Sequence, residues 1–232
     1  MKSLSQNLSA PVMVLDQSAV PAAGWMRLLG SSLRAAVVVM LISGIAYPLV
    51  TTGVAHWVMP QAANGSLIER DGKVIGSALI GQQFTGAQYF HGRPSATMAP
   101  DPDKEGASIA APYNAGLSGA SNQGATHKDL SEAVAQRVAQ YRADNGLAAD
   151  VKVPVDAVTA SASGLDPHIS VANAALQLPR VAKARGLVPE QVQLVLEQAT
   201  EQRTFGLLGE PRINVLRLNL ALDALQTSAH KE

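Results

Sequence analysis

The pattern of hydrophobic and polar positions divides this chain into one long apolar run and a longer region of mixed character. The run, Ala35 to Met59, reads AAVVVMLISGIAYPLVTTGVAHWVM and contains no Lys, Arg, Asp or Glu. About 20 apolar residues allow a helix to cross the hydrocarbon core of a bilayer, and this run supplies about 25. No second run of this kind follows. The pattern therefore predicts a single transmembrane helix within residues 28–60, followed by one further domain.

The charges beside this run predict its orientation. Arg27 and Arg34 lie just before the apolar run, whereas residues 60–67, just after it, contain no basic side chain. Lys and Arg concentrate on the cytoplasmic flank of a membrane helix. We therefore expect residues 1–27 to form a cytoplasmic tail, and residues 61–232 to form a periplasmic domain attached to the inner membrane. A cleaved signal peptide is the alternative, but its apolar region is usually only ~7–15 residues long.

One face of the predicted span carries residues that a simple lipid anchor does not need. Four small or polar residues recur at intervals of four: Gly44, Pro48, Thr52 and His56. Small and hydroxyl-bearing side chains let membrane helices approach closely and hydrogen-bond to each other. The proline is also expected to kink the helix, which neighbouring helices make tolerable. We interpret this stripe as an interface with a partner helix, and the alternative is a lone anchor in which such residues occur by chance.

The segment after the span begins with a predicted β-hairpin. Leu67–Arg70 and Lys73–Gly76 are β-prone and flank Asp71-Gly72, a pair that favours the positive φ angles of a type I′ turn. Residues 78–80 are expected to continue the second strand. Residues 81–126 then lack periodicity and are rich in Gly, Ser, Ala, Pro and Asn. Because a structureless loop of this length is improbable in a compact domain, this segment is either an ordered functional surface or partly disordered.

Three helices are predicted in the second half of the chain from apolar periodicity and capping residues. The first runs from Asp129 to Asn145, the second from a cap at Ser170 to Arg185, and the third begins at Pro189. Glycine follows each of the first two helices, as at a left-handed C-terminal cap. Proline is well suited to the first position of a helix, which supports the start of the third.

The final element is ambiguous between strand and helix. Its leucines alternate with other residues between Ile213 and Leu222, which is typical of a strand with one exposed face. Leucine also favours helices. We predict a strand from Ile213 to about Leu220, followed by a helical turn. Strands at both ends with helices between them predict an α+β domain.

The composition excludes several function classes. The 232 residues carry a formal net charge of zero and contain no Cys. A neutral chain gives no indication of nucleic-acid binding, and the absence of Cys excludes disulfides and thiolate metal sites. The five histidines form no HxH or HExxH pair, so we predict no metal site. The acidic residues Asp101, Asp103 and Glu105 lack the full calcium-loop pattern and are interpreted as a solvated turn.

Two local clusters suggest chemistry without meeting the pattern of a known site. Ser161 and Ser163 lie near Asp166 and His168, as a serine hydrolase would need, but triads are usually assembled from distant segments. The simpler interpretation is a turn followed by a helix cap. In residues 117–121, LSGAS, three small residues resemble the signature loop of ABC ATPases: Ser118, Gly119 and Ser121. No Walker A pattern accompanies them, so no nucleotide site is assigned.

Several segments together resemble the C subunit of the bacterial potassium-transporting P-type ATPase, the Kdp complex. The shorter ones are YPL at 47–49, GSALIGQ at 76–82, YFHGRPSA at 89–96 and SGASN at 118–122. The longer ones are TASASGLDPHIS at 159–170, RVAKARGL at 180–187 and GEPRINVLRLNLALD at 209–223. Their order matches the family, and the resemblance covers nearly all of the chain after Arg27.

The resemblance implies an accessory subunit. In that family a channel-like A subunit carries potassium, a B subunit hydrolyses ATP, and a small F peptide joins them. The C subunit is described as a chaperone-like partner that raises the affinity of the B subunit for ATP. ATP and potassium would then be handled by partner subunits, and this chain would hold no cofactor stably. Because the predicted orientation places the domain outside the cytoplasm, an effect on ATP affinity would pass through the span.

The resemblance also nominates a functional surface. Its polar motif residues are Arg93, Ser95, Asn122, Asp166, His168, Glu210, Arg212 and Asn219. The competing hypothesis is a membrane-anchored periplasmic enzyme of serine-hydrolase type that uses Ser161 or Ser163 with His168. The two hypotheses differ in a simple observation: a subunit co-purifies with membrane partners, whereas an anchored enzyme is extracted alone.

Overall fold

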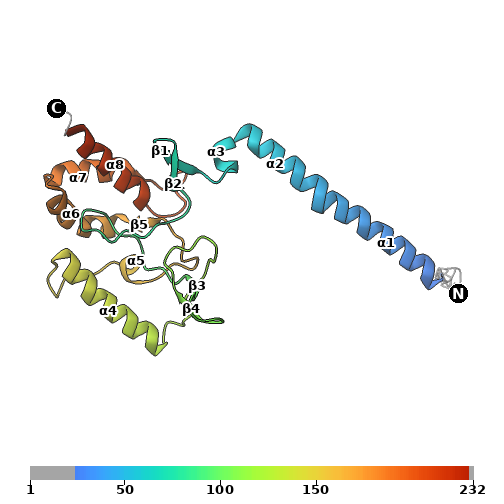
Figure 1. Cartoon of the computed structure of the whole chain (residues 1–232), viewed down its shortest axis with the longest axis horizontal. Coiled ribbons are helices and arrows are strands. Elements are labelled where there is room, and N and C mark those ends of the chain that lie inside the picture. Colours follow the sequence, from blue (N-terminus) through green and yellow to red (C-terminus); the bar gives the residue numbers. More distant parts are fainter. Residues whose placement is uncertain (1–23, 230–232) are drawn as a thin grey trace, which may run out of the picture. The chain divides into compact units, whose positions relative to one another are not determined.

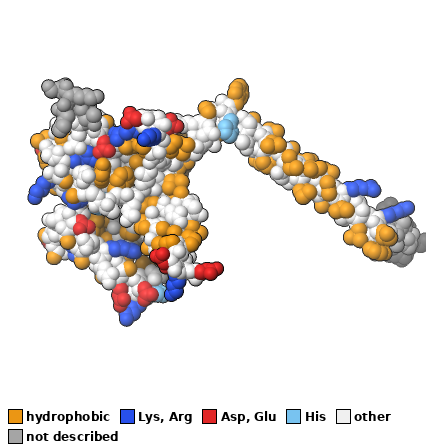
Figure 2. Space-filling model, in the orientation of Figure 1, with side chains coloured by type: hydrophobic (Ala, Val, Ile, Leu, Met, Phe, Trp, Pro, Cys, Tyr) orange, Lys and Arg blue, Asp and Glu red, His pale blue; other side chains and the backbone are white. Residues whose placement is uncertain are grey.

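The structure, a computed structural model, describes residues 24–229, and the chain forms two units that divide between Met59 and Pro60. The described part of the first unit is a continuous helix made of α1 (Trp25–Leu41), a π-helical segment (Ile42–Ala46) and α2 (Tyr47–Val58). It is long and apolar enough to cross a membrane. Figure 2 shows hydrophobic side chains along its length and basic side chains only towards its N-terminal end. Most of the predicted cytoplasmic tail, residues 1–23, lies outside the described residues.

The π-helical segment has a local cause in the sequence. Pro48 has no N–H to donate to the carbonyl of Gly44, and its ring would collide with that carbonyl in a regular α-helix. The backbone adjusts just before this point, because the N–H of Tyr47 bonds to the carbonyl of Ile42, five residues back. Prolines and π-segments are the usual sites of helix bends. The irregularity expected at the proline therefore takes the form of a widened turn beside it.

The second unit begins with a short helix, α3 (Pro60–Ala63), and the predicted hairpin of β1 (Leu67–Arg70) and β2 (Lys73–Ser77). Asp71 and Gly72 have φ angles of 53° and 73°, which confirms the positive-φ turn. The prediction that residues 78–80 continue the second strand is wrong. The Ser77 hydroxyl accepts the N–H of Leu79 and donates to the carbonyl of Gly65, so the chain turns at this serine.

Residues 81–126 form an ordered surface, which settles the alternative left open by the sequence. They contain the hairpin of β3 (Met98–Pro100) and β4 (Ser108–Ala110), and the rest is irregular. Phe90 is fully buried within the hydrophobic core. The Asn219 side chain accepts the N–H of Phe90 over 2.8 Å and donates to its carbonyl over 3.0 Å. Because the backbone of this segment has few strand partners, its N–H and carbonyl groups bond to side chains of the helical region instead.

The remaining elements alternate helices with short strands (Figure 1). They are α4 (Lys128–Asn145), α5 (Val155–Val158), β5 (His168–Ser170), α6 (Val171–Arg185), α7 (Pro189–Ala199), β6 (Thr200–Glu201), β7 (Arg212–Asn214) and α8 (Val215–Ala229). The three strands form an antiparallel sheet in the order β5-β7-β6. Helices and strands mixed in this way confirm the α+β class.

The capping residues behave as the sequence predicts. The Ser170 side chain accepts the N–H of Asn173 at the start of α6, and Pro189 opens α7. Gly146 and Gly186 end α4 and α6 with φ angles of 63° and 67°. At the start of α4 the cap is His127, whose ring nitrogen accepts a backbone N–H. Each of these helix ends therefore has a capping residue that is visible in the local sequence.

The hydrophobic core lies where α6, α7 and α8 meet the three-stranded sheet. Its buried members are Phe90, Ile169, Ala174, Leu178, Val181, Ala182, Val192, Leu196, Ile213, Val215, Leu218 and Leu222. Helix α4 packs against α5 and α6 outside this cluster. The apolar pattern leaves Arg137 and Arg142 on the outer face of α4, but both are half-buried and donate to the carbonyls of Val158 and Val151. Helix α4 is thus attached partly through its arginines.

The predicted strand from Ile213 to Leu220 is wrong beyond its second residue. Strand β7 ends at Asn214, whose side chain accepts the N–H of Arg217 over 3.1 Å and so starts the helix α8. The buried residues Val215, Leu218 and Leu222 are three and four positions apart, which is helical spacing. The leucine-rich pattern satisfies both periods, and the asparagine hydrogen bond decides between them.

Candidate functional site

The structure brings five of the eight polar motif residues around one cavity of the second unit. The cavity has a volume of about 460 Å³ and is lined by Arg93, Val155, Asp156, Thr159, Asp166, His168, Ile169, Ser170, Glu210, Pro211 and Arg212. These residues come from four separate segments of the chain. The resemblance named the motif residues individually, and only the fold shows that five of them share one surface. We call this cavity the charged groove.

A chain of alternating basic and acidic side chains runs along the charged groove. The guanidinium of Arg93 donates to Asp166 over 3.0 Å, and the other oxygen of Asp166 lies 3.4 Å from Nδ1 of His168. The Nε2 atom of His168 lies 3.6 Å from Glu201, which in turn accepts from Arg212 over 3.1 Å. Asp166 therefore lies between two basic groups, and Glu201 lies near three, since Arg217 is 3.7 Å from it. The lining itself carries two arginines and three carboxylates, Asp156, Asp166 and Glu210, so the groove is polar and slightly acidic.

Asp166 is the central member of this chain. A turn at Asp166-Pro167 positions it, because its side chain accepts the backbone N–H of His168 over 3.0 Å. Burial alone would raise the pKa of Asp166, but hydrogen bonds from His168 and Arg93 outweigh burial and lower the pKa to about 2. The carboxylate is therefore ionised throughout the physiological range and serves as a fixed anchor for both basic side chains.

Arg93 connects the irregular segment 81–126 to the motif at 159–170. In addition to the bond with Asp166, its guanidinium donates to the carbonyls of Thr159 and Ala160. Its own carbonyl accepts the hydroxyl of Tyr113 over 2.7 Å. Burial, together with the negative charge of Asp166, raises the pKa of Tyr113 to about 12, so this phenol stays protonated as a donor. The contacts of Arg93 explain why an arginine in a loop segment is structurally important.

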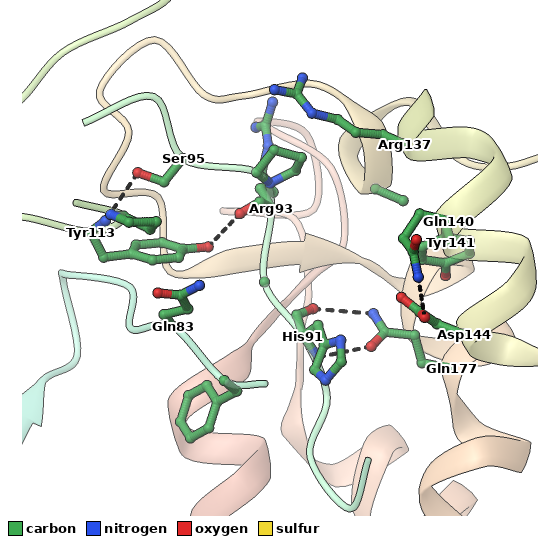
Figure 3. A pocket seen from close by; sticks show the side chains of 15 residues that line it. Gln83, His91, Arg93, Ser95, Tyr113, Arg137, Gln140, Tyr141, Asp144 and Gln177 are labelled. Atoms are coloured by element: carbon green, nitrogen blue, oxygen red, sulfur yellow. Dashed lines mark hydrogen bonds between the residues drawn. The ribbon is translucent and has the colours of Figure 1, made fainter. Parts of the chain in front are cut away.

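Arg93 also lines a second cavity, which has a volume of about 460 Å³ as well (Figure 3). Gln177 of α6 fixes the backbone of His91 in the lining of this cavity. It accepts the N–H of His91 over 2.8 Å and donates to the carbonyl of His91 over 3.1 Å. Burial, with the positive charge of Arg180, lowers the pKa of His91, which favours the neutral ring. The lining of the cavity mixes amide and hydroxyl side chains with charged and apolar ones. Among residues 24–229 no group of three or more His, Cys, Asp or Glu could hold a metal ion.

In the segment that resembles an ABC signature loop, Ser118 and Gly119 form hydrogen bonds to another loop of this chain. The Ser118 hydroxyl and the Gly119 N–H both bond to the carbonyl of Ser163, over 2.9 and 3.0 Å. Gly164, with φ of 68°, packs so closely that an added Cβ would lie 2.8 Å from the carbonyl oxygen of Gly119. Ser95 supports the same place by donating to the carbonyl of Gly164. The small residues therefore permit close backbone packing between two loops.

Two other motif residues lie apart from the charged groove. Asn219 is buried and holds the backbone of Phe90, as described above, so its role is structural. Asn122 is exposed and has a φ angle of 52°, a conformation that asparagine adopts more readily than most residues. Sequence reasoning missed Asp156, which accepts the N–H and hydroxyl of Ser170 and the side-chain amide of Asn173. It reinforces the cap of α6, and no local pattern marks it.

The serine-hydrolase arrangement is not supported by the geometry. Both ring nitrogens of His168 face carboxylates, Asp166 and Glu201. The hydroxyls of Ser161 and Ser163 lie 3.4 Å from each other and accept the N–H groups of the next loop residues, Gly164 and Leu165. Within the described residues, neither serine is hydrogen-bonded to the histidine. The cluster is a turn of the kind that the simpler interpretation predicts.

Comparison with known proteins extends the resemblance over most of the chain. The family described as K+-transporting ATPase, c chain (KdpC), matches residues 29–224. The chain belongs to this family. A relative from Rhodopseudomonas palustris, named potassium-transporting ATPase KdpC subunit, is 55% identical over 184 residues, which cover 79% of this chain and 90% of the relative. Relatives with the same name from Bradyrhizobium diazoefficiens and Mycobacterium bovis are also 55% identical, over 82% and 80% of this chain and 96% and 92% of their own lengths.

The matched region includes both the span and the second unit. It begins within α1 and ends within α8, so it includes the charged groove and the four stripe residues of the span. On the helix, Nδ1 of His56 lies 2.9 Å from the carbonyl oxygen of Thr52, and a Cβ added at Gly44 would meet no atom within 4 Å beyond the adjacent residues and backbone of its own helix. The position at Gly44 is therefore open to a neighbouring helix.

Proposed function

We propose that this chain is the accessory, non-catalytic subunit of a high-affinity, ATP-driven potassium uptake complex in the bacterial inner membrane. The observation that supports this proposal most directly is the family match over residues 29–224, which includes span and domain together. The proposed partners are the channel-like A subunit, the ATP-hydrolysing B subunit and the F peptide. Those subunits handle ATP and potassium, and this chain holds neither as a cofactor.

The site geometry supports a binding role over a catalytic one. The charged side chains of the groove bond to each other, which leaves the histidine between two carboxylates and without a nucleophile beside it. A general base must be within hydrogen-bond reach of the group that it deprotonates. The groove therefore provides a rigid polar surface, and such a surface suits contact with another subunit.

The proposed topology follows from charge and length. Arg27 and Arg34 favour the cytoplasmic side for the N-terminus, which puts the second unit in the periplasm. The stripe of Gly44, Pro48, Thr52 and His56 is the proposed contact with a helix of a partner subunit. An effect on the affinity of the B subunit for ATP would act through this span, since the domain and the ATP site would lie on opposite sides of the membrane.

Growth at limiting potassium tests the proposal. A strain that lacks this chain is expected to fail at very low external potassium and to recover when potassium is plentiful. The full-length chain should restore growth, whereas a variant in which Ala35–Met59 is exchanged for an unrelated poly-Leu helix should not. Potassium-coupled ATP hydrolysis by membranes of the same strains provides the biochemical measurement. Full ATP-driven uptake by the other subunits without this chain would refute the proposed accessory role.

A further inference from the structure

A loop between β6 and β7 presents three large hydrophobic side chains to solvent. The loop comprises residues 203–210, RTFGLLGE, and we call it the FGLL loop. Phe205, Leu207 and Leu208 are 89%, 80% and 63% exposed. Together they offer an apolar patch of roughly 400 Å², within the size range of patches that are often functional on soluble proteins. Packing within this chain does not explain why three large hydrophobic residues lie exposed within four positions.

The FGLL loop is a preformed turn. The N–H groups of Leu207 and Leu208 bond to the carbonyl of Thr204, and the N–H of Thr204 bonds back to the carbonyl of Leu208. Phe205 and Gly206 at its tip have φ angles of 55° and 72°. A bulky residue with positive φ is unusual, and strained backbone of this kind is concentrated at functional positions. The turn therefore directs the ring of Phe205 outward. The positive φ costs conformational energy, and the exposed ring gains too little packing within the described residues to compensate for it.

Charged residues enclose the FGLL loop and connect it to the charged groove. Arg203 and Glu210 form an ion pair across its base. Glu210 and the next two residues, Pro211 and Arg212, also line the groove. The apolar tip and the polar groove are thus neighbouring parts of one surface, and the ion pair leaves the base of the loop without net charge.

These features favour one class of occupant. A second copy of this chain is a poor fit, since the patch is about half of the ~800 Å² that each partner contributes to a standard interface. A lipid surface is also a poor fit, because membrane-inserting loops and helices usually combine apolar residues with Lys, Arg, Trp or Tyr at the rim. Here the rim arginines, Arg203 and Arg212, are already paired with the carboxylates of Glu210 and Glu201. A small apolar contact suffices when a second attachment already holds the partners together.

We infer that the FGLL loop inserts Phe205 and Leu207 into an apolar socket on another subunit of the same membrane complex. This inference rests on the proposed function, since the span supplies the first attachment. The contact then fixes the orientation of the domain over its partner, and the adjacent charged groove faces the polar rim of the socket. The chain contributes a rigid projection, and the partner contributes the apolar cavity.

Site-specific photocrosslinking in the intact membrane complex tests the inference. A benzophenone amino acid replaces Phe205 in one full-length chain and the exposed Leu194 of α7 in a control chain. Co-purification of the other subunits with the wild-type chain comes first, and its failure would overturn the proposed function and this inference together. After irradiation we expect position 205 to form a protein adduct with another subunit, and position 194 to form little. Adducts with lipid alone, with a second copy, or equally at both positions would overturn the inference.

A substitution that preserves the turn provides an independent measurement. Asparagine tolerates positive φ well, so Phe205→Asn removes the ring and relieves the backbone. We expect the melting temperature of the variant to stay unchanged or to rise, while retention of the other subunits after detergent washing falls about tenfold. Leu194→Asn serves as the matched control and should retain them fully. Equal retention by Phe205→Asn and wild type would show that the loop makes no stabilising contact.

Discussion

Replacing Asp166 by Asn should destabilise the second unit without changing the size of the side chain. The carboxylate accepts from Arg93 over 3.0 Å and from the backbone of His168 over 3.0 Å, and its side chain is 29% exposed. Its pKa falls from 3.8 to about 2 in the folded chain. Each pKa unit corresponds to about 1.4 kcal/mol, so the ionised form contributes about 2 kcal/mol to the free energy of unfolding.

The pH dependence of this contribution has a defined sign. The folded pKa of Asp166 lies below the pKa in the unfolded chain. The stabilisation is therefore fully present above about pH 4 and is lost as the pH falls through about 2, below which both states are protonated. The Asp166→Asn variant lacks this titration. The difference in stability between wild type and variant should shrink over the same interval.

Chemical denaturation of the second unit measures the difference. Its core residues all lie after Pro60, and both tryptophans, Trp25 and Trp57, lie in the span, so far-UV circular dichroism is the suitable signal. We expect a loss of about 2 kcal/mol at neutral pH, or roughly 4–8 °C in melting temperature for a domain of this size. Asp103→Asn, at an exposed position of the β3–β4 loop, is the matched control. A difference below about 0.5 kcal/mol, or one that persists unchanged in acid, would refute the reasoning.

The other predictions concern the membrane helix and the absence of catalysis. Gly44→Leu should reduce assembly with the partner subunits, measured by co-purification, whereas Val38→Leu off the stripe should not, and equal effects would refute the face assignment. A periplasm-dependent reporter fused to the C-terminus should be active, and a stable but inactive fusion would reverse the topology. Ser161→Ala and Ser163→Ala should each cost on the order of 1 kcal/mol in unfolding experiments; loss of a hydrolytic activity of the isolated domain would instead support the enzyme hypothesis.

Features with local physical causes could be predicted from the sequence. The membrane-length helix, the Asp71-Gly72 hairpin and the Ser170 cap each depend on residues that are close together in the chain. The helix that ends at Gly186 is defined in the same way. At these positions the hydrophobic periodicity and the capping or turn residues indicate the same element, so the sequence has a single interpretation.

Features that depend on distant partners could not be predicted. Alternating leucines after Ile213 fit a strand as well as a helix. The Asn214 side chain starts the helix by accepting from Arg217, and the same side chain is held in place by the carbonyl of Ala78, 136 residues away in the chain. The second strand ends at Ser77 because of a hydroxyl that bonds to Gly65, twelve residues back. The motif residues could be nominated singly, but their assembly into a groove depends on loops that only the fold brings together.

The distribution of polar contacts explains how a long irregular segment can be rigid enough to act as a binding surface. Residues 81–126 contain few ladder bonds of their own, so the backbone needs partners from elsewhere. Asn219 and Gln177 bond both polar groups of Phe90 and His91, respectively, and Arg180 donates to the carbonyls of two further residues. The helical core thus fixes the surface through two buried amide side chains and one half-buried guanidinium. Such a domain uses its polar chemistry for shape, and this supports a subunit that recognises partners over one that transforms a substrate.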